Sequence, residues 1–141
     1  MLCAHGHCDC PHLAMHATFF LTTMPLFGGA LLSDWAYASS QQIQWANFAA
    51  WLNAGGLLIA GPSLLWGAVA LLRSSSTRHR RSGVYLTLML ATFVAGFINA
   101  LVHAKDGWAA MPTGLILSAI VVVLAGMASA FGLAATWRRA A

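Results

Sequence analysis

Hydrophobic residues gather in four long segments, and polar residues gather in the short breaks between them. The apolar segments cover residues 13–32, 44–72, 83–103 and 112–137. A helix that crosses the hydrocarbon core of a bilayer needs about 20 residues, and each segment is long enough. The pattern therefore predicts an all-α fold, an integral membrane four-helix bundle.

The stretches outside these segments divide the chain further. Residues 1–12 are rich in Cys and His, and we expect them to form a cytoplasmic N-terminal segment. Residues 13–137 form the transmembrane domain, and residues 138–141 form a short basic tail. Asp34 and Trp35 follow the first apolar segment, and we expect them to mark its exit into the membrane interface.

The composition supports a membrane protein. Only 7% of the residues are charged and 60% are hydrophobic, whereas about a quarter of the residues of a soluble domain are charged. The net charge of +4 comes from basic residues at segment ends, which form no stripe along one face. The lipid bilayer is the expected partner, and nucleic acid is not.

The basic residues also orient the predicted helices. The break Arg73–Arg81 holds four of the seven Lys and Arg residues, and Arg138 and Arg139 add two more near the C-terminus. Under the positive-inside rule, short loops rich in Lys and Arg stay in the cytoplasm. An even number of crossings puts both termini on that side. The sequence predicts a multi-pass protein of the bacterial inner membrane, with its N-terminus and C-terminus inside the cell.

A cleaved signal peptide is the alternative for the first segment. Ala36, Tyr37 and Ala38 have the small-x-small form of a cleavage site. However, no basic residue precedes the apolar stretch, as a signal peptide requires. We therefore expect the segment to be kept as the first helix.

A cluster of soft-metal ligands precedes the first segment. Thiolate and imidazole groups bind Zn, Cu and Fe, and the cluster consists of Cys3, His5, His7, Cys8, Cys10 and His12. Its spacing, Cys-x4-Cys-x-Cys with interleaved His, matches none of the usual zinc or iron–sulfur patterns. One hypothesis is a site for a soft metal ion. The alternative, which the irregular spacing favours, is a terminus with adventitious metal affinity.

Histidine placement argues against haem b held by this chain alone. His16 lies at the cytoplasmic start of the first predicted helix, and His103 lies at the outer end of the third. A span of about 20 residues separates two such imidazoles by roughly 25–30 Å along the membrane normal. They cannot ligate one iron, although His16 remains a candidate ligand in a haem site shared with another protein.

A second candidate site gathers near the outer ends of the predicted helices. It consists of Asp34, Asn99, His103 and Asp106, with Lys105 beside them. Ionisable groups close to the bilayer are candidates for function, and such a pocket would suit a quinone head group that accepts a hydrogen bond. The alternative is a set of ordinary helix-end charges that anchor the bundle at the interface.

Two blocks of sequence resemble a known family. They are GALLSDWAYASSQQIQWANFAAWLNAGGLLIAG at residues 29–61 and INALVHAKDGWAAMPTGLILSA at residues 98–119. Both are similar to the DUF2231 family of uncharacterised bacterial inner-membrane proteins, whose members are expected to form four helices. Members are often encoded beside quinoprotein sugar dehydrogenases, or fused to them, so the resemblance implies a redox neighbourhood.

Several polar positions typical of that family are changed in this chain. The family usually opens its first helix with His-Pro, closes its second helix with Asp and opens its third with His. Here His16 fits the first position and is followed by Ala17, while Ala70 and Tyr85 stand at the other two.

The favoured hypothesis is a non-catalytic accessory or anchoring subunit of an inner-membrane complex, with an electron-transport assembly as the favoured complex. One alternative is a small electron-transfer subunit that binds haem b or quinone, and another is a metal sensor or carrier. Small-residue helix faces, for example Gly55–Gly61, favour association with other membrane subunits. We identify no catalytic residue, because no nucleophile–base pair is suggested by the spacing. Transport is disfavoured, because no segment is expected to bury a charge at mid-depth.

Overall fold

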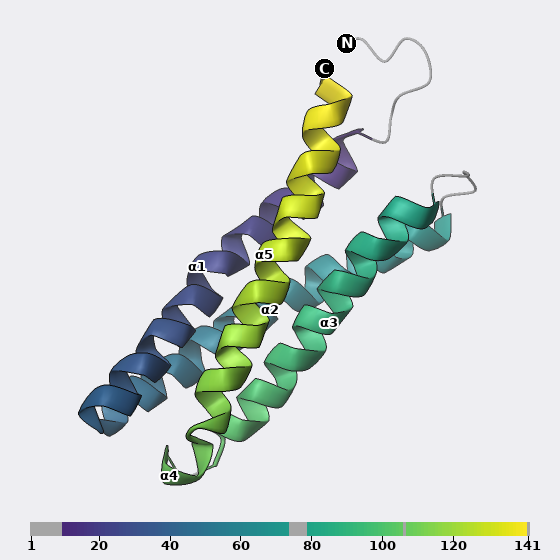
Figure 1. Ribbon diagram of the computed structural model, residues 1–141. Coiled ribbons are helices and arrows are strands. Elements are labelled where there is room, and N and C mark those ends of the chain that lie inside the picture. Colours follow the sequence, from purple (N-terminus) through teal and green to yellow (C-terminus); the bar gives the residue numbers. More distant parts are fainter. Residues whose placement is uncertain (1–9, 74–78, 106, 141) are drawn as a thin grey trace.

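Four long helices and one short helix account for most of the chain in the computed structural model (Figure 1). They are α1 (Cys10–Ser40), α2 (Ile43–Arg73), α3 (His79–His103), α4 (Gly107–Ala110) and α5 (Thr113–Ala140). The structure describes the backbone of residues 10–73, 79–105 and 107–140, and the side chains of residues 21–73, 83–105 and 109–134. No strand occurs within those ranges, so the predicted all-α fold is confirmed.

The long helices run alternately up and down the bundle. α1 and α3 each pack against both α2 and α5, so α1 and α3 lie on one diagonal of a four-membered arrangement. The first residues of α1 and the last residues of α5 lie at the same end as the connection between α2 and α3 (Figure 1). The turn between α1 and α2 lies at the other end with α4, and we call this the α4 end.

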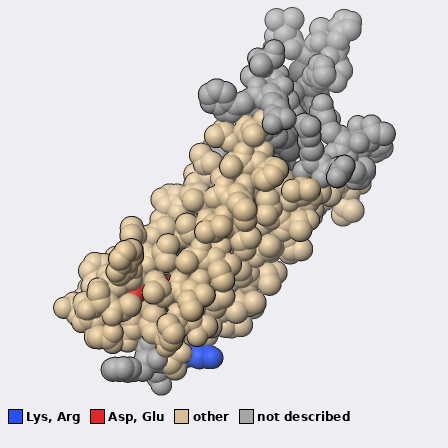
Figure 2. Space-filling view, in the orientation of Figure 1, with Lys and Arg blue, Asp and Glu red and all other residues tan. Residues whose placement is uncertain are grey.

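Three of these helices are long and apolar enough to cross a membrane. The qualifying stretches, among residues with described side chains, are Ile43–Arg73, Gly83–His103 and Thr113–Ala134. The face in Figure 2 is uncharged over almost all of its described surface, with small areas of blue and red toward one end. The protein is therefore a membrane protein built as a helical bundle.

The first helix is longer than its hydrophobic segment predicts. Instead of ending near residue 32, α1 continues through Asp34 and Trp35 to Ser40. The helix ends where Gln41 adopts a left-handed conformation with φ of 56° and donates its N–H to the carbonyl of Tyr37 at 2.8 Å. The prediction that Asp34 marks an exit into the interface is wrong, because this carboxylate is fully buried inside the bundle.

The interior of the bundle is unusually polar, and its exterior is apolar. Large side chains such as Leu58 and Phe97 are exposed, which suits a surface that faces lipid. Several buried hydroxyls bond to the carbonyl one turn earlier in their own helix. The buried polar residues are Thr23, Ser33, Asp34, Asn53, Ser63, Thr92, Asn99, Ser118 and Ser129.

Small residues of the inner faces make room for large side chains of neighbouring helices. A Cβ at Gly56 would lie 2.5 Å from the Phe27 ring, and one at Gly61 would lie 3.3 Å from the Phe93 ring. Phe27 belongs to the central hydrophobic cluster, which also contains Ala60, Met89, Val121, Ala125 and Ala128. Gly56 and Gly61 are thus used for packing within the chain.

Candidate functional site

The one ion pair within the described ranges joins Asp34 of α1 to His103 of α3. Nε2 of His103 lies 2.7 Å from Oδ1 of Asp34, and the side chains are 2% and 0% exposed. This contact crosses the diagonal of the bundle, where the two helices have little other packing. The pair therefore joins two elements that are otherwise held only through α2 and α5.

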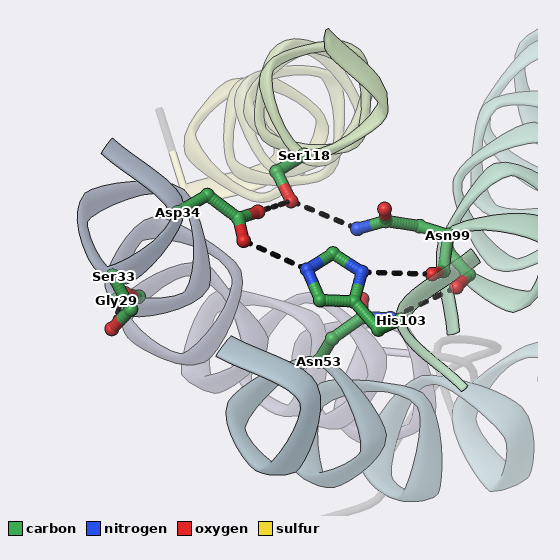
Figure 3. A network of polar contacts seen from close by, with 8 residues as sticks. Gly29, Ser33, Asp34, Asn53, Asn99, His103 and Ser118 are labelled. Atoms are coloured by element: carbon green, nitrogen blue, oxygen red, sulfur yellow. Dashed lines mark hydrogen bonds and ion pairs between the residues drawn. The ribbon is translucent and has the colours of Figure 1, made fainter. Parts of the chain in front are cut away.

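Two further residues complete a closed circuit of hydrogen bonds (Figure 3). The side-chain amide of Asn99 donates to Oγ of Ser118 at 2.8 Å, and the Ser118 hydroxyl donates to Oδ2 of Asp34 at 2.5 Å. Nδ1 of His103 lies 2.9 Å from the carbonyl oxygen of Asn99. We call Asp34, Asn99, His103 and Ser118 the polar network.

Local helix geometry positions these side chains. Asn99 and His103 are four residues apart on α3 and therefore lie on one face, a turn apart. On α5, Gly114 lies one turn before Ser118, and a Cβ at Gly114 would lie 3.0 Å from Cε1 of His103. The missing side chain at Gly114 leaves the space that the imidazole occupies.

A second amide connects α2 to the same region. Nδ2 of Asn53 donates to the carbonyl oxygen of Gly96 at 3.1 Å, one turn before Asn99 on α3. The side-chain oxygens of Asn53 and Asn99 are buried and have no hydrogen-bond partner among the described residues. All four long helices thus contribute a buried polar group to this region.

The arrangement does not match a nucleophile–base pair. An activated serine donates its proton to a base such as imidazole, but the Ser118 hydroxyl points at the Asp34 carboxylate. Both imidazole nitrogens of His103 are already hydrogen-bonded. Ligation of a haem iron by His103 would break one of these bonds, because an axial ligand uses a ring nitrogen.

The structure brings together three of the residues predicted near the outer helix ends. Asp34, Asn99 and His103 share the polar network, whereas Lys105 is exposed outside it. Asp106 lies outside the described residues.

The predicted metal cluster lies outside the described side chains. Cys3, His5, His7 and Cys8 precede the described backbone, while Cys10, His12 and His16 belong to α1 without described side chains. Among the side chains that the structure describes, no group of three or more His, Cys, Asp or Glu residues is close enough to hold a metal ion.

Sequence reasoning missed Ser118, Asn53 and Gly114. Ser118 is an isolated polar residue in the apolar first half of α5, and Asn53 has only apolar or small neighbours within three residues on α2. Polar residues inside a transmembrane segment usually face the bundle interior, so both carried a usable signal. Gly114 carried no such signal in the sequence, because it makes space for His103 only once α3 and α5 are packed together.

A comparison with protein families finds a match over most of the chain. The family model described as "Predicted membrane protein (DUF2231)" matches residues 12–141. No curated protein and no solved structure matches the chain.

Proposed function

The chain belongs to the DUF2231 family of predicted membrane proteins, and we propose that it is a non-catalytic accessory or anchoring subunit of a bacterial inner-membrane complex. The observation that carries this proposal is the closure of the polar network. Both oxygens of Asp34 and both ring nitrogens of His103 are engaged within the chain. A pair so engaged serves to fix the helices in place rather than to bind a substrate.

The energetics support a structural role for this pair. Removing one partner of a buried ion pair leaves the other charge uncompensated and costs about 3–5 kcal/mol. Asp34 and His103 belong to helices on opposite corners of the bundle. Loss of their contact would therefore destabilise the packing of all four long helices. A fixed helix arrangement is what an anchoring subunit offers to its neighbours.

The outer surface supports residence beside other membrane proteins. Large aromatic side chains are exposed near the turn between α1 and α2, including Trp35, Phe48 and Trp51, the last of which is 75% exposed. Aromatic side chains are favoured at membrane interfaces and in protein contacts. The redox neighbourhood implied by the family resemblance makes an electron-transport assembly the proposed partner.

The orientation is also a proposal. The positive-inside rule places the connection between α2 and α3, which begins after Arg73, in the cytoplasm. The α4 end then faces outward, and the polar network lies near the outer leaflet. Asp34 and His103 themselves stay buried inside the bundle.

Co-purification from native membranes tests the proposed function. Tagged chain expressed at its natural level is extracted in a mild detergent, and its neighbours are identified by mass spectrometry. We expect a defined membrane complex to accompany both the wild type and the D34N variant, because the amide introduced by D34N can still bond to His103 and Ser118. We expect the complex to be lost with D34A. A chain that always migrates as a lone monomer, even after cross-linking in the membrane, would overturn the proposal.

An absorption spectrum of the same preparation distinguishes the proposed anchoring subunit from the alternative, an electron-transfer subunit that binds haem. A non-catalytic anchor without haem absorbs only through its aromatic residues. A Soret band that follows this chain after the partner is removed would replace the proposed function with electron transfer.

A further inference from the structure

We propose that the contact between Asp34 and His103 is a proton-binding site, which holds one exchangeable proton and joins α1 to α3 only while that proton is present. The proposal rests on the hydrogen-bond geometry of the polar network. It does not depend on the function proposed above.

The hydrogen-bond partner of Nδ1 determines which ring nitrogen of His103 must carry a hydrogen. A backbone carbonyl oxygen only accepts hydrogen bonds, and the carbonyl of Asn99 lies 2.9 Å from Nδ1 of His103. Nδ1 must therefore carry a hydrogen. If His103 is neutral, its other nitrogen, Nε2, then has a lone pair and no hydrogen.

The Ser118 hydroxyl determines which oxygen of Asp34 can carry a proton. The amide nitrogen of Asn99 only donates, so Oγ of Ser118 accepts from it and gives its own hydrogen to Oδ2 of Asp34. Oδ2 is thereby an acceptor. Any proton carried by Asp34 must sit on Oδ1, the oxygen that faces His103.

One proton is then required between Oδ1 of Asp34 and Nε2 of His103. Without it, a carboxylate oxygen and a nitrogen lone pair would face each other at 2.7 Å, which is a repulsive contact between two acceptors. With it, the pair is either an imidazolium beside a carboxylate or a neutral imidazole beside a carboxylic acid. Both forms contain the same number of protons, and both are neutral overall, as a site in a membrane protein favours.

No other described ionisable side chain forms part of the contact between Asp34 and His103. The remaining ionisable side chains in the described ranges are Tyr37, Arg73, Tyr85 and Lys105. Tyr37 is buried one turn beyond Asp34 on α1, and Lys105 is exposed two residues beyond His103. Arg73 and Tyr85 lie toward the opposite end of α2 and α3, and α5 contributes no ionisable group among its described side chains.

The position of the pair defines the side from which the proton comes. His103 is the last residue of α3, and Asp34 lies six residues before the end of α1, about 9 Å along the helix at 1.5 Å per residue. Because these ends of α1 and α3 lie at the α4 end of the bundle (Figure 1), both residues are close to that end. The site therefore exchanges its proton with the water on the α4 side of the membrane.

The pH dependence of folding tests the proposal, with D34N as the critical variant. Above about pH 7 an unfolded chain has an ionised Asp and a mostly neutral His, so the folded wild type holds one proton more than the unfolded chain. Its stability must then fall as pH rises. We expect the unfolding equilibrium constant to increase by up to tenfold per pH unit between pH 7 and pH 9.

The proposal predicts opposite effects of D34N and S118A on this dependence of stability on pH. In D34N the side-chain amide donates to Nε2 and its oxygen accepts from Ser118, so the contact needs no added proton and the slope should disappear. S118A removes a hydrogen bond but not the proton, so it should lower stability while keeping the wild-type slope. A D34N slope equal to that of the wild type would overturn the proposal.

A second measurement observes the hydrogens of His103 in the wild-type protein. Solid-state NMR of ¹⁵N-histidine protein in lipid bilayers reports which nitrogens of His103 carry hydrogen, with H103Q used to assign its signals. We expect Nδ1 to be protonated at every pH where the bundle is folded. A His103 with hydrogen on Nε2 and none on Nδ1 would contradict the proposal directly.

Discussion

Asp34 tolerates burial because each of its carboxylate oxygens has a hydrogen-bonding partner. Oδ1 faces His103 and Oδ2 accepts from Ser118, and in an interior of low dielectric such bonds strengthen one another. Neither partner is near Asp34 in sequence, since His103 is 69 residues away and Ser118 is 84 residues away. An acidic residue that the sequence places at a helix exit is therefore a central member of the bundle.

Gly114 offers a test at this scale, because its missing side chain makes room for His103. A methyl group at Gly114 would lie 3.0 Å from Cε1 of the imidazole, and overpacking of this kind costs about 1–3 kcal/mol. We expect G114A to lower the free energy of unfolding by that amount, as measured by SDS titration in mixed micelles.

G28A is the matched control for this substitution. Gly28 also lies inside a long helix, but a Cβ there would meet nothing within 4 Å. Because Ala is a better helix former than Gly, we expect G28A to be neutral or to stabilise the protein by up to about 1 kcal/mol. Equal effects of the two substitutions would mean that His103 does not occupy the space beside Gly114.

At the scale of the elements, the hydrophobic pattern predicted the four long helices but not all of their ends. The second helix was expected at residues 44–72 and is found at Ile43–Arg73, because its apolar run stops at a charged residue. The first was expected to end near residue 32 and extends to Ser40. The helix ends at the left-handed Gln41, and the hydrophobic pattern contains no signal for that conformation.

The end of α1 can be tested through Gln41. This residue has a left-handed φ of 56°, a conformation in which glycine avoids a steric cost of about 1 kcal/mol. We expect Q41G to raise the free energy of unfolding by up to that amount. Q42G, one residue later, should give no gain, and a Q41G protein less stable than Q42G would argue that α1 ends elsewhere.

For the whole molecule, composition and segment length were enough to predict a membrane-embedded helical bundle. They were not enough to predict which helices pack against each other, because the inner face of each helix could pack against several others. The diagonal contact between α1 and α3 depends on single residues, Asp34 and His103, whose partnership no periodicity reveals. The orientation in the membrane remains a prediction from the positions of Arg and Lys.

Thiol labelling of intact cells checks that orientation. In a chain whose three native cysteines are replaced, S39C lies in the exposed last turn of α1 at the α4 end, and S75C lies in the connection between α2 and α3. We expect a membrane-impermeant thiol reagent to label S39C in whole cells and S75C only after lysis. The reverse pattern would place the polar network near the cytoplasmic leaflet.

The contact between Asp34 and His103 is the feature on which the structural role and the proton site both depend, and a double-mutant cycle measures it most directly. The free energies of unfolding of wild type, D34A, H103A and the double variant are compared near neutral pH in the same micelles. Residues in direct contact couple by roughly 0.5–3 kcal/mol, and for this buried pair we predict at least about 2 kcal/mol, with the double variant little worse than either single one. Effects that add to within about 0.5 kcal/mol would show that the two side chains do not interact, and would contradict the account.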